Sequence, residues 1–232
     1  MIRELVLPEK PKLVFSEKNK ATFEISPLYP GYGITIGNAL RRVLLSSIKG
    51  SAITLVHIEN VLHEFSTIPG VLEDVIDILL ALKKVRVKYE GEEPIELELY
   101  KKGEGVIFAK DIKCPAGVEI VNPDLKIATI TSNDTEVKMT LTVERGYGFS
   151  SAEEREKDRV EPGTIVIDAI FSPIVNVTYE VENIVYKEKA DYNLLRITIE
   201  TDGTITPEKA LKEATEILIK HFEVIHEAFS ES

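Results

Sequence analysis

Hydrophobic and polar residues alternate along most of the chain, and this two-residue period is that of half-buried β-strands. The alternation is strict at 95–99 and 137–143, and Gly, Pro, Asn and Asp lie between the runs. Residues 12–28 alternate on both sides of Lys18-Asn19-Lys20, which predicts a hairpin of two strands. Further strands are expected at 53–58, 179–185 and 195–200, and the pattern from 85 to 181 is almost wholly that of strands.

A helical pattern first occurs at residues 38–48, where we expect a short helix with Gly50 as its C-cap. The preceding segment 29–33 is expected to break regular structure, because Gly31 and Gly33 permit backbone angles that bulkier residues resist. One face of this helix carries Leu40, Val43, Leu44, Ser47 and Ile48, and another carries Asn38, Arg41, Arg42 and Leu45.

Two further helices are expected later in the chain. Residues 71–84 have apolar side chains at helical spacing: Leu72, Val75, Ile76, Leu79 and Leu82. The longest helix runs from Pro207 to about Phe229, with Thr206 as its N-cap. Residues 150–159 have no apolar face and are expected to form a loop. The predicted fold class is therefore α+β, with two or three helices on antiparallel sheet.

The last helix has more apolar surface than one neighbouring sheet needs. Its apolar residues are Ala210, Leu211, Ala214, Ile217, Leu218, Phe222, Ile225, Ala228 and Phe229. Either the helix is simply buried, or a second copy of the chain covers the remaining flank. The same choice arises at Arg41, Arg42 and Leu45, which fit either an ordinary surface or a protein interface.

Composition narrows the class of function. The formal net charge of −11 argues against gripping nucleic acid as the main task, because phosphate binding depends on cations. No apolar run is long enough to span a membrane, and the first residues do not resemble a signal peptide. A single cysteine, Cys114, fits a reducing cytoplasm. The lack of Gln and Trp, with abundant Glu, Lys, Ile and Val, is typical of thermophilic proteins.

Catalytic, metal or cofactor chemistry is not indicated by any motif. The glycines of 31–37 invite comparison with a phosphate-binding loop, but such a loop ends in Gly-Lys-Ser/Thr, and here Asn38-Ala39 follows. His221 and His226 are five residues apart, so a helix would place them on different faces. We therefore expect no catalytic residue, no metal and no cofactor, although an α+β enzyme or a nucleic-acid-binding module stays open as an alternative.

Several ordered motifs resemble those of bacterial RNA polymerase alpha subunits, specifically of their N-terminal domain. The matching stretches are Pro27-Leu28, Gly31-Tyr32-Gly33, 35–48, 61–67, 70–75, 166–173, 201–205 and 207–211. The resemblance implies two lobes: a discontinuous dimerisation subdomain, 1–48 with 169–232, and a mostly β inserted subdomain, 49–168. It also implies a homodimeric, non-catalytic scaffold that binds the beta and beta-prime subunits in the cytoplasm, where the polymerase associates with the nucleoid.

Residue roles follow from the same resemblance. The beta-subunit interface would comprise Asn38, Arg41, Arg42 and Leu45, and the beta-prime interface would comprise Lys83 and Ile167. The dimer interface would comprise Tyr32, Ile36, Leu40, Val43, Leu218, Phe222 and Ile225. Pro30 and Ala190 depart from the family pattern and receive no role. Family members continue into a small DNA-binding domain, so this sequence is interpreted as one domain of a longer protein, without direct DNA binding.

Overall fold

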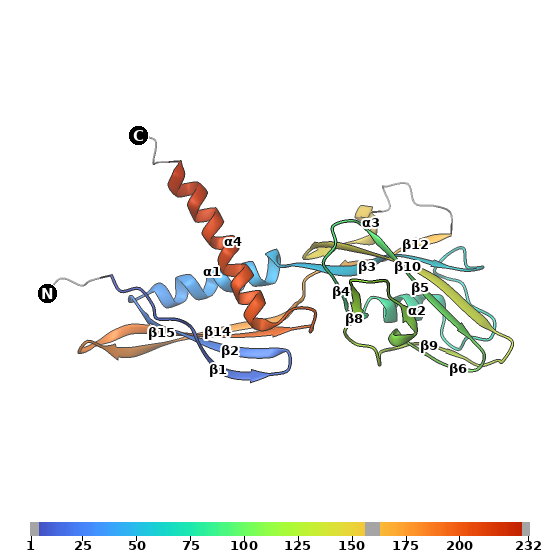
Figure 1. The fold of residues 1–232 in the computed structure, drawn as a ribbon, viewed down its shortest axis with the longest axis horizontal. Helices are drawn as coiled ribbons and strands as arrows, with labels where there is room; N and C mark the ends of the chain where they lie inside the picture. The colour runs from blue at the N-terminus through green and yellow to red at the C-terminus, as the bar shows by residue number, and fades with distance from the viewer. Residues whose placement is uncertain (1–4, 156–162, 229–232) are drawn as a thin grey trace. The chain divides into compact units, whose positions relative to one another are not determined.

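The computed structural model describes residues 5–155 and 163–228, and it has the predicted α+β class with antiparallel sheets (Figure 1). The chain divides into two compact units, Met1–Ile48 with Pro173–Ser232 and Lys49–Ser172. The sequence places the second boundary at residue 169. In the structure β13 (Ala169–Ile170) pairs with β11 (Phe149–Ser150), and Phe171 packs with Ala52, so these residues remain with the second unit.

A four-stranded antiparallel sheet forms the base of the first unit. Its strand order is β1 (Lys12–Glu17), β2 (Lys20–Leu28), β15 (Lys189–Thr201) and β14 (Ile174–Tyr186). The hairpin predicted around Lys18 is confirmed, and Lys18 has a positive φ of 44°. One face of the sheet is apolar and carries both helices, whereas the other is polar, as in many antiparallel sheets. On that polar face Arg196 donates hydrogen bonds to Glu24 and Glu182.

Helix α1 (Tyr32–Ser47) begins six residues earlier than expected and packs on β14 and β15. The prediction that 29–33 breaks regular structure was wrong for Tyr32 and Gly33, which already belong to α1. Gly33 and Gly37 instead allow strand β14 to pack closely against the helix. A Cβ at Gly33 would lie 2.6 Å from Val181 Cγ1, and one at Gly37 would lie 2.7 Å from Tyr179 Cδ2. The expected C-cap was also wrong, since Ile48 ends the helix in an extended conformation and Gly50 lies within the next strand.

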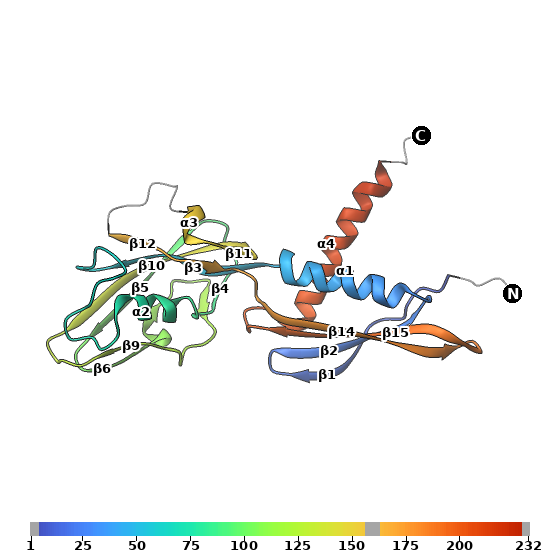
Figure 2. The same cartoon turned by 180° about the vertical axis from the view of Figure 1, so that it is seen from behind.

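Helix α4 (Pro207–Glu227) begins as predicted: Thr206 Oγ1 accepts a hydrogen bond from the backbone N–H of Lys209. Its first half packs against β2, β15 and α1, where Ala210, Leu211 and Ala214 are buried. Its second half projects away from the sheet, as both views show (Figures 1 and 2). Phe229 lies outside the described residues.

The second unit is mostly β, as the sequence predicts. A five-stranded sheet has the order β12 (Thr164–Val166), β3 (Lys49–Ile58), β10 (Glu136–Tyr147), β5 (Ile95–Lys102) and β7 (Ile112–Lys113). Two-stranded sheets join β4 (Val87–Tyr89) to β8 (Val118–Ile120) and β6 (Gly105–Phe108) to β9 (Lys126–Ile130). A short 3-10 turn, η1 (Ala109–Asp111), precedes β7. Apolar residues from these sheets and from α2 (Val75–Leu82) form one core.

Two helical expectations in this unit need correction. Helix α2 begins at Val75 rather than Val71, because the preceding residues bond to strand β9 instead. The N–H of Leu72 donates to Thr129 O, and the Glu73 carboxylate accepts from both the N–H and the hydroxyl of Thr129. The loop expected at 150–159 starts at the end of β11 and contains a single helical turn, α3 (Ala152–Arg155), and residues 156–159 lie outside the described part of the chain.

Candidate functional site

A group of exposed apolar side chains in the first unit lies on the second half of α4. The exposed fractions are 48% for Ile219, 62% for Phe222, 68% for Val224 and 57% for Ile225. Leu218 and Ile217 are half-buried against the core of the same unit. Two turns of apolar helix in water are costly to maintain, so this end of α4 is a candidate protein interface. Ile219 and Val224 were not among the expected interface residues.

The outer surface of α1 continues this apolar character. Tyr32 is exposed, Ile36 and Val43 are half-buried, and Ile34, which the sequence analysis overlooked, is exposed. Leu40 has a different place from the one expected, since only 4% of its surface is exposed. It packs in the core beneath α1, and therefore it can support an interface from below but offers little surface to a partner.

The polar side of α1 carries the expected arginine face. Arg42 and Asn38 are exposed, and Leu45 is half-buried against the core. Arg41 Nε donates to the carbonyl of Val177 at 3.3 Å, so this side chain is partly engaged with strand β14. Both arginines are exposed, and Arg41 is in addition held against β14 by this hydrogen bond.

A buried amide fixes the start of α1. Gly31, at the N-cap position, has φ 87° and no side chain with which to cap the helix. Asn193 on β15 supplies the cap from a distance: its Oδ1 accepts from the N–H of Gly31 at 2.9 Å and of Gly33 at 3.4 Å. Its Nδ2 donates to Asn183 Oδ1 at 2.9 Å. The helix that carries both candidate faces is thus tied to the β14–β15 hairpin.

In the second unit, Lys83 lies at the end of α2 and forms an ion pair with Asp168. The Lys83 Nζ to Asp168 Oδ2 distance is 2.8 Å, and the other carboxylate oxygen accepts from the N–H of Ala152. The hydrogen bond from Lys83 and then that from Ala152 lower the pKa of Asp168. Ile167, expected at an interface, is only 4% exposed, and its N–H donates to Thr54 O. Its side chain therefore belongs to the core.

Near Lys83 the structure exposes an apolar surface that the sequence analysis missed. Helix α2 is apolar on both sides: Val75, Ile78, Leu79 and Leu82 face the core, whereas Ile76 and Leu80 face solvent. Leu72, which precedes the helix, is exposed as well. Leu62 and Phe65, in the loop before α2, are also exposed. A cleft of about 470 Å³ lies between this loop, Leu79 and strand β12. The spacing of four between Ile76 and Leu80 was the available signal.

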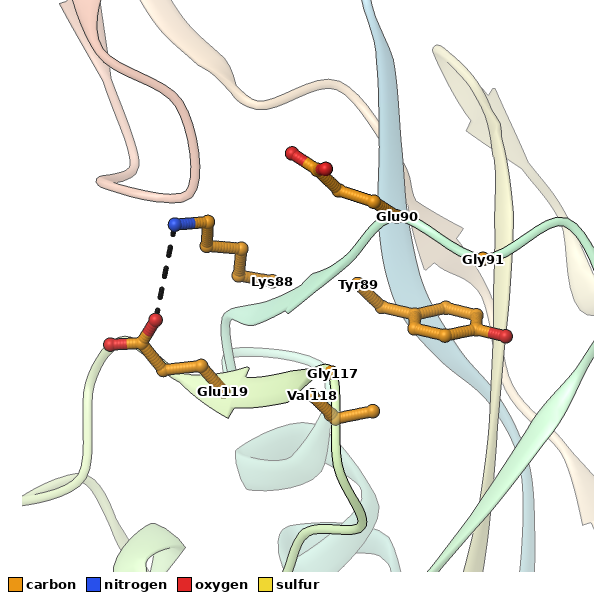
Figure 3. A pocket seen from close by; sticks show the side chains of 7 residues that line it. All are labelled: Lys88, Tyr89, Glu90, Gly91, Gly117, Val118 and Glu119. Atoms are coloured by element: carbon orange, nitrogen blue, oxygen red, sulfur yellow. Dashed lines mark ion pairs between the residues drawn. The ribbon is translucent and has the colours of Figure 1, made fainter.

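A second hollow, of about 670 Å³, lies beside β4 and β8 (Figure 3). On one side of it Lys88 and Glu119 point toward each other with 3.9 Å between Nζ and Oε2, and the Tyr89 hydroxyl donates to the carbonyl of Glu93. Its polar groups do not converge on one point.

Across residues 5–155 and 163–228, no three His, Cys, Asp or Glu side chains are grouped to hold a metal ion. No helix in that part of the chain is long and apolar enough to cross a membrane.

Comparison with known proteins decides the family. The family described as RNA polymerase Rpb3/RpoA insert domain matches residues 56–172, which lie within the second unit. The alpha subunit of DNA-directed RNA polymerase from Roseiflexus sp. (strain RS-1) is 48% identical over 222 residues, covering 96% of this chain and 68% of the relative. The chain belongs to the alpha-subunit family of DNA-directed RNA polymerase.

Other members of the alpha-subunit family align over the same extent. The protein from Desulfitobacterium hafniense (strain DSM 10664 / DCB-2) is 49% identical over 217 residues, 92% of this chain and 69% of its own length. The one from Aquifex aeolicus (strain VF5) is 45% identical over 235 residues, 100% of this chain and 73% of its own length. The Aquifex aeolicus alignment, which covers the whole chain, therefore includes both compact units and the surfaces described above.

Proposed function

We propose that this chain is a non-catalytic assembly subunit of a bacterial RNA polymerase in the cytoplasm. It forms a homodimer through α1 and α4, and the dimer then binds the beta and beta-prime subunits. The observation that carries the proposal is the exposed apolar half of α4, together with membership of the alpha-subunit family. A soluble domain rarely leaves Phe222, Val224 and Ile225 in water on one projecting helix unless another surface covers them.

In this proposal the two large subunits bind different faces. The Arg42 side of α1 serves the beta subunit, because a guanidinium offers five donors in a planar arrangement that suits a desolvated protein contact. The surface around Lys83 serves the beta-prime subunit, with the outward residues Leu72, Ile76 and Leu80 supplying apolar contact area. Ile167 acts indirectly, since it is buried next to Asp168, the ion-pair partner of Lys83.

The test has two parts. Light scattering should give twice the 26.0 kDa mass of one chain at micromolar concentration, because obligate two-fold interfaces typically bury more than ~2,000 Å². Purified beta subunit should then be captured by the dimer, whereas duplex DNA in a parallel filter-binding assay should not. A solution mass of a single chain, or capture of DNA in place of the beta subunit, would overturn the proposal.

A further inference from the structure

The segment that leads into α2 lies against the edge of strand β9 that β6 leaves open. Val71 forms an isolated antiparallel bridge with Ile130 on β9. Next to this bridge, the N–H of Leu72 donates to the carbonyl of Thr129 at 2.9 Å. These are the contacts of an antiparallel pair, so the segment briefly extends the two-stranded sheet before the helix begins.

The Glu73 carboxylate ends this pairing. In a continued antiparallel pair the N–H of Thr129 would donate to the carbonyl of Leu72, but it donates to Glu73 Oε2 at 2.6 Å instead. Glu73 Oε1 accepts from the Thr129 hydroxyl at 3.0 Å and lies 2.9 Å from Lys126 Nζ. Only 17% of the Glu73 side chain is exposed. Burial alone would raise the pKa of this carboxyl group, but the hydrogen bonds from Lys126 and Thr129 outweigh that effect, so the pKa is lowered.

The start of α2 therefore depends on groups outside the helix. Asp74, at the N-cap position, makes no capping hydrogen bond with its side chain. The first helical residue, Val75, donates its N–H to the carbonyl of Ser66 in the preceding loop at 3.2 Å. Glu73 lies directly before the N-cap, so its bonds to β9 fix the point at which the chain leaves the sheet and enters the helix.

Exposed apolar side chains lie on both sides of Glu73 in the sequence. Leu72 is 68% exposed, and Ile76 and Leu80 on the outward side of α2 are 40% and 48% exposed. Leu72 is not part of the helix, so helical geometry does not set its position relative to Ile76. The bonds of Leu72 and Glu73 to Thr129 set it instead. A surface that is already ordered in this way binds a partner with a smaller entropic cost.

We infer that Glu73 is a positioning residue for the beta-prime contact, because it holds Leu72 and the start of α2 in the arrangement that the partner binds. The inference rests on the proposed binding of the beta-prime subunit to this surface. Glu73 acts through its neighbours, since both of its carboxylate oxygens are engaged with Thr129 and Lys126 and little of its side chain is exposed.

A merely structural role would have a different signature. The side chains that fix α2 to the core are at most 7% exposed; they are Val75, Ile78, Leu79 and Leu82. Loss of the Glu73 carboxylate removes none of these core contacts, so the helix should stay folded while the segment before it gains freedom. The affinity for the beta-prime subunit should therefore fall even under conditions in which the second unit is fully folded.

The experiment titrates purified beta-prime subunit onto dimers that already carry the beta subunit. Glu73→Ala should raise the beta-prime dissociation constant about fivefold or more, since the segment must then be ordered on binding, and should leave the beta dissociation constant within about twofold. Glu73→Gln keeps a carbonyl oxygen that can accept from the N–H of Thr129, so it should restore the beta-prime affinity to within about threefold of wild type. Glu96→Ala, which removes an exposed carboxylate from β5, is the matched control and should behave as wild type.

Amide hydrogen exchange separates positioning from folding. In Glu73→Ala the amide of Thr129 should exchange faster, whereas the amide of Ile78 within α2 should keep its protection. Loss of protection at Ile78, with equal loss of affinity for both large subunits, would show a structural role and overturn the inference. Thr129→Val removes only the hydroxyl and serves as the second variant if Glu73→Ala does not fold; unchanged beta-prime affinity in this variant would also overturn the inference.

A variant of the surface itself separates this inference from the proposed function. Leu80→Glu places a charge on the outward side of α2 and should abolish beta-prime capture if that surface binds the subunit. If Leu80→Glu abolishes capture but Glu73→Ala binds normally, Glu73 is not a positioning residue, whereas the proposed contact stands. If Leu80→Glu binds normally as well, the proposed contact is refuted and the inference falls with it.

Discussion

Replacing Asn193 with alanine should destabilise the first unit by about 2 to 3 kcal/mol. Only 6% of Asn193 is exposed, and its side chain makes three hydrogen bonds, two of them to the N–H groups that open α1. Loss of an N-cap side chain typically costs ~1 kcal/mol. The N–H of Gly33 would also lose its acceptor, and a buried unsatisfied group costs roughly 1–3 kcal/mol.

Urea unfolding followed by circular dichroism measures this loss, and two variants separate its parts. Asn193→Asp keeps an acceptor for both N–H groups and places a negative charge at the helix N-terminus, which is favourable, so it should be milder than alanine. Asn183→Ala removes only the outer hydrogen bond and should cost about 0.5–1.5 kcal/mol. If Asn193→Ala changed the free energy of unfolding by less than about 0.5 kcal/mol, the amide would not be what fixes the start of α1.

Three further predictions concern the surfaces. Ile225→Glu should abolish dimerisation while the melting temperature of the monomeric unit changes little, because this side chain is exposed in the single chain; light scattering and a thermal melt at low concentration check both. Arg42→Ala should keep the dimer and its stability but weaken beta-subunit capture more than about tenfold, as measured by titration. Asp168→Asn should lose most stability near neutral pH and little in acid. The pKa of Asp168 is lowered in the folded state, mainly by Lys83, so its stabilising contribution exists above the unfolded pKa near ~3.9 and is lost as pH falls through the folded value. In urea melts, the difference in stability between the two proteins should therefore shrink as the pH falls from 7 into the acid range, and a constant difference would contradict the ion-pair argument.

Local signals predicted the elements whose causes are local. The hairpin turn at Lys18, the Thr206 N-cap and the α4 helix could be recognised because each depends on residues within a few positions of one another. The start of α1 could not, because its cap comes from Asn193, which is 162 residues from Gly31 in the sequence. Gly33 likewise resembles a helix breaker until strand β14 is known to pack against it.

The candidate surfaces likewise include features that the local sequence predicted and features that depend on distant parts of the chain. Apolar spacing on α4 predicted surplus surface, but it could not show that burial ends near Leu218, because that depends on where the sheet ends. On α2 the outward residues Ile76 and Leu80 alternate with buried ones, so a sequence pattern alone reads as one wide core face. Leu40 and Ile167 were expected at interfaces from the family resemblance, and the structure places both in the cores. The position of a residue in a sequence motif does not show whether its side chain contacts a partner or supports the contacting residues from the core.

Raising the salt concentration should have opposite effects on the proposed dimer interface of α1 and α4 and on the proposed beta-subunit contact at Arg42. Each copy carries a formal charge of −11, so two copies repel, and the repulsion is screened over about 8 Å at physiological ionic strength. In the proposed dimer the attraction between the copies is instead apolar, and sulfate or phosphate salts strengthen such burial. Dimerisation should therefore tighten as salt rises. Capture of the beta subunit through Arg42 should weaken over the same range, because screening reduces a contact made by a charged side chain. One titration series across salt concentrations thus distinguishes a seam held by Phe222 and Ile225 from a face held by a guanidinium group, and the same direction of change in both would refute that division.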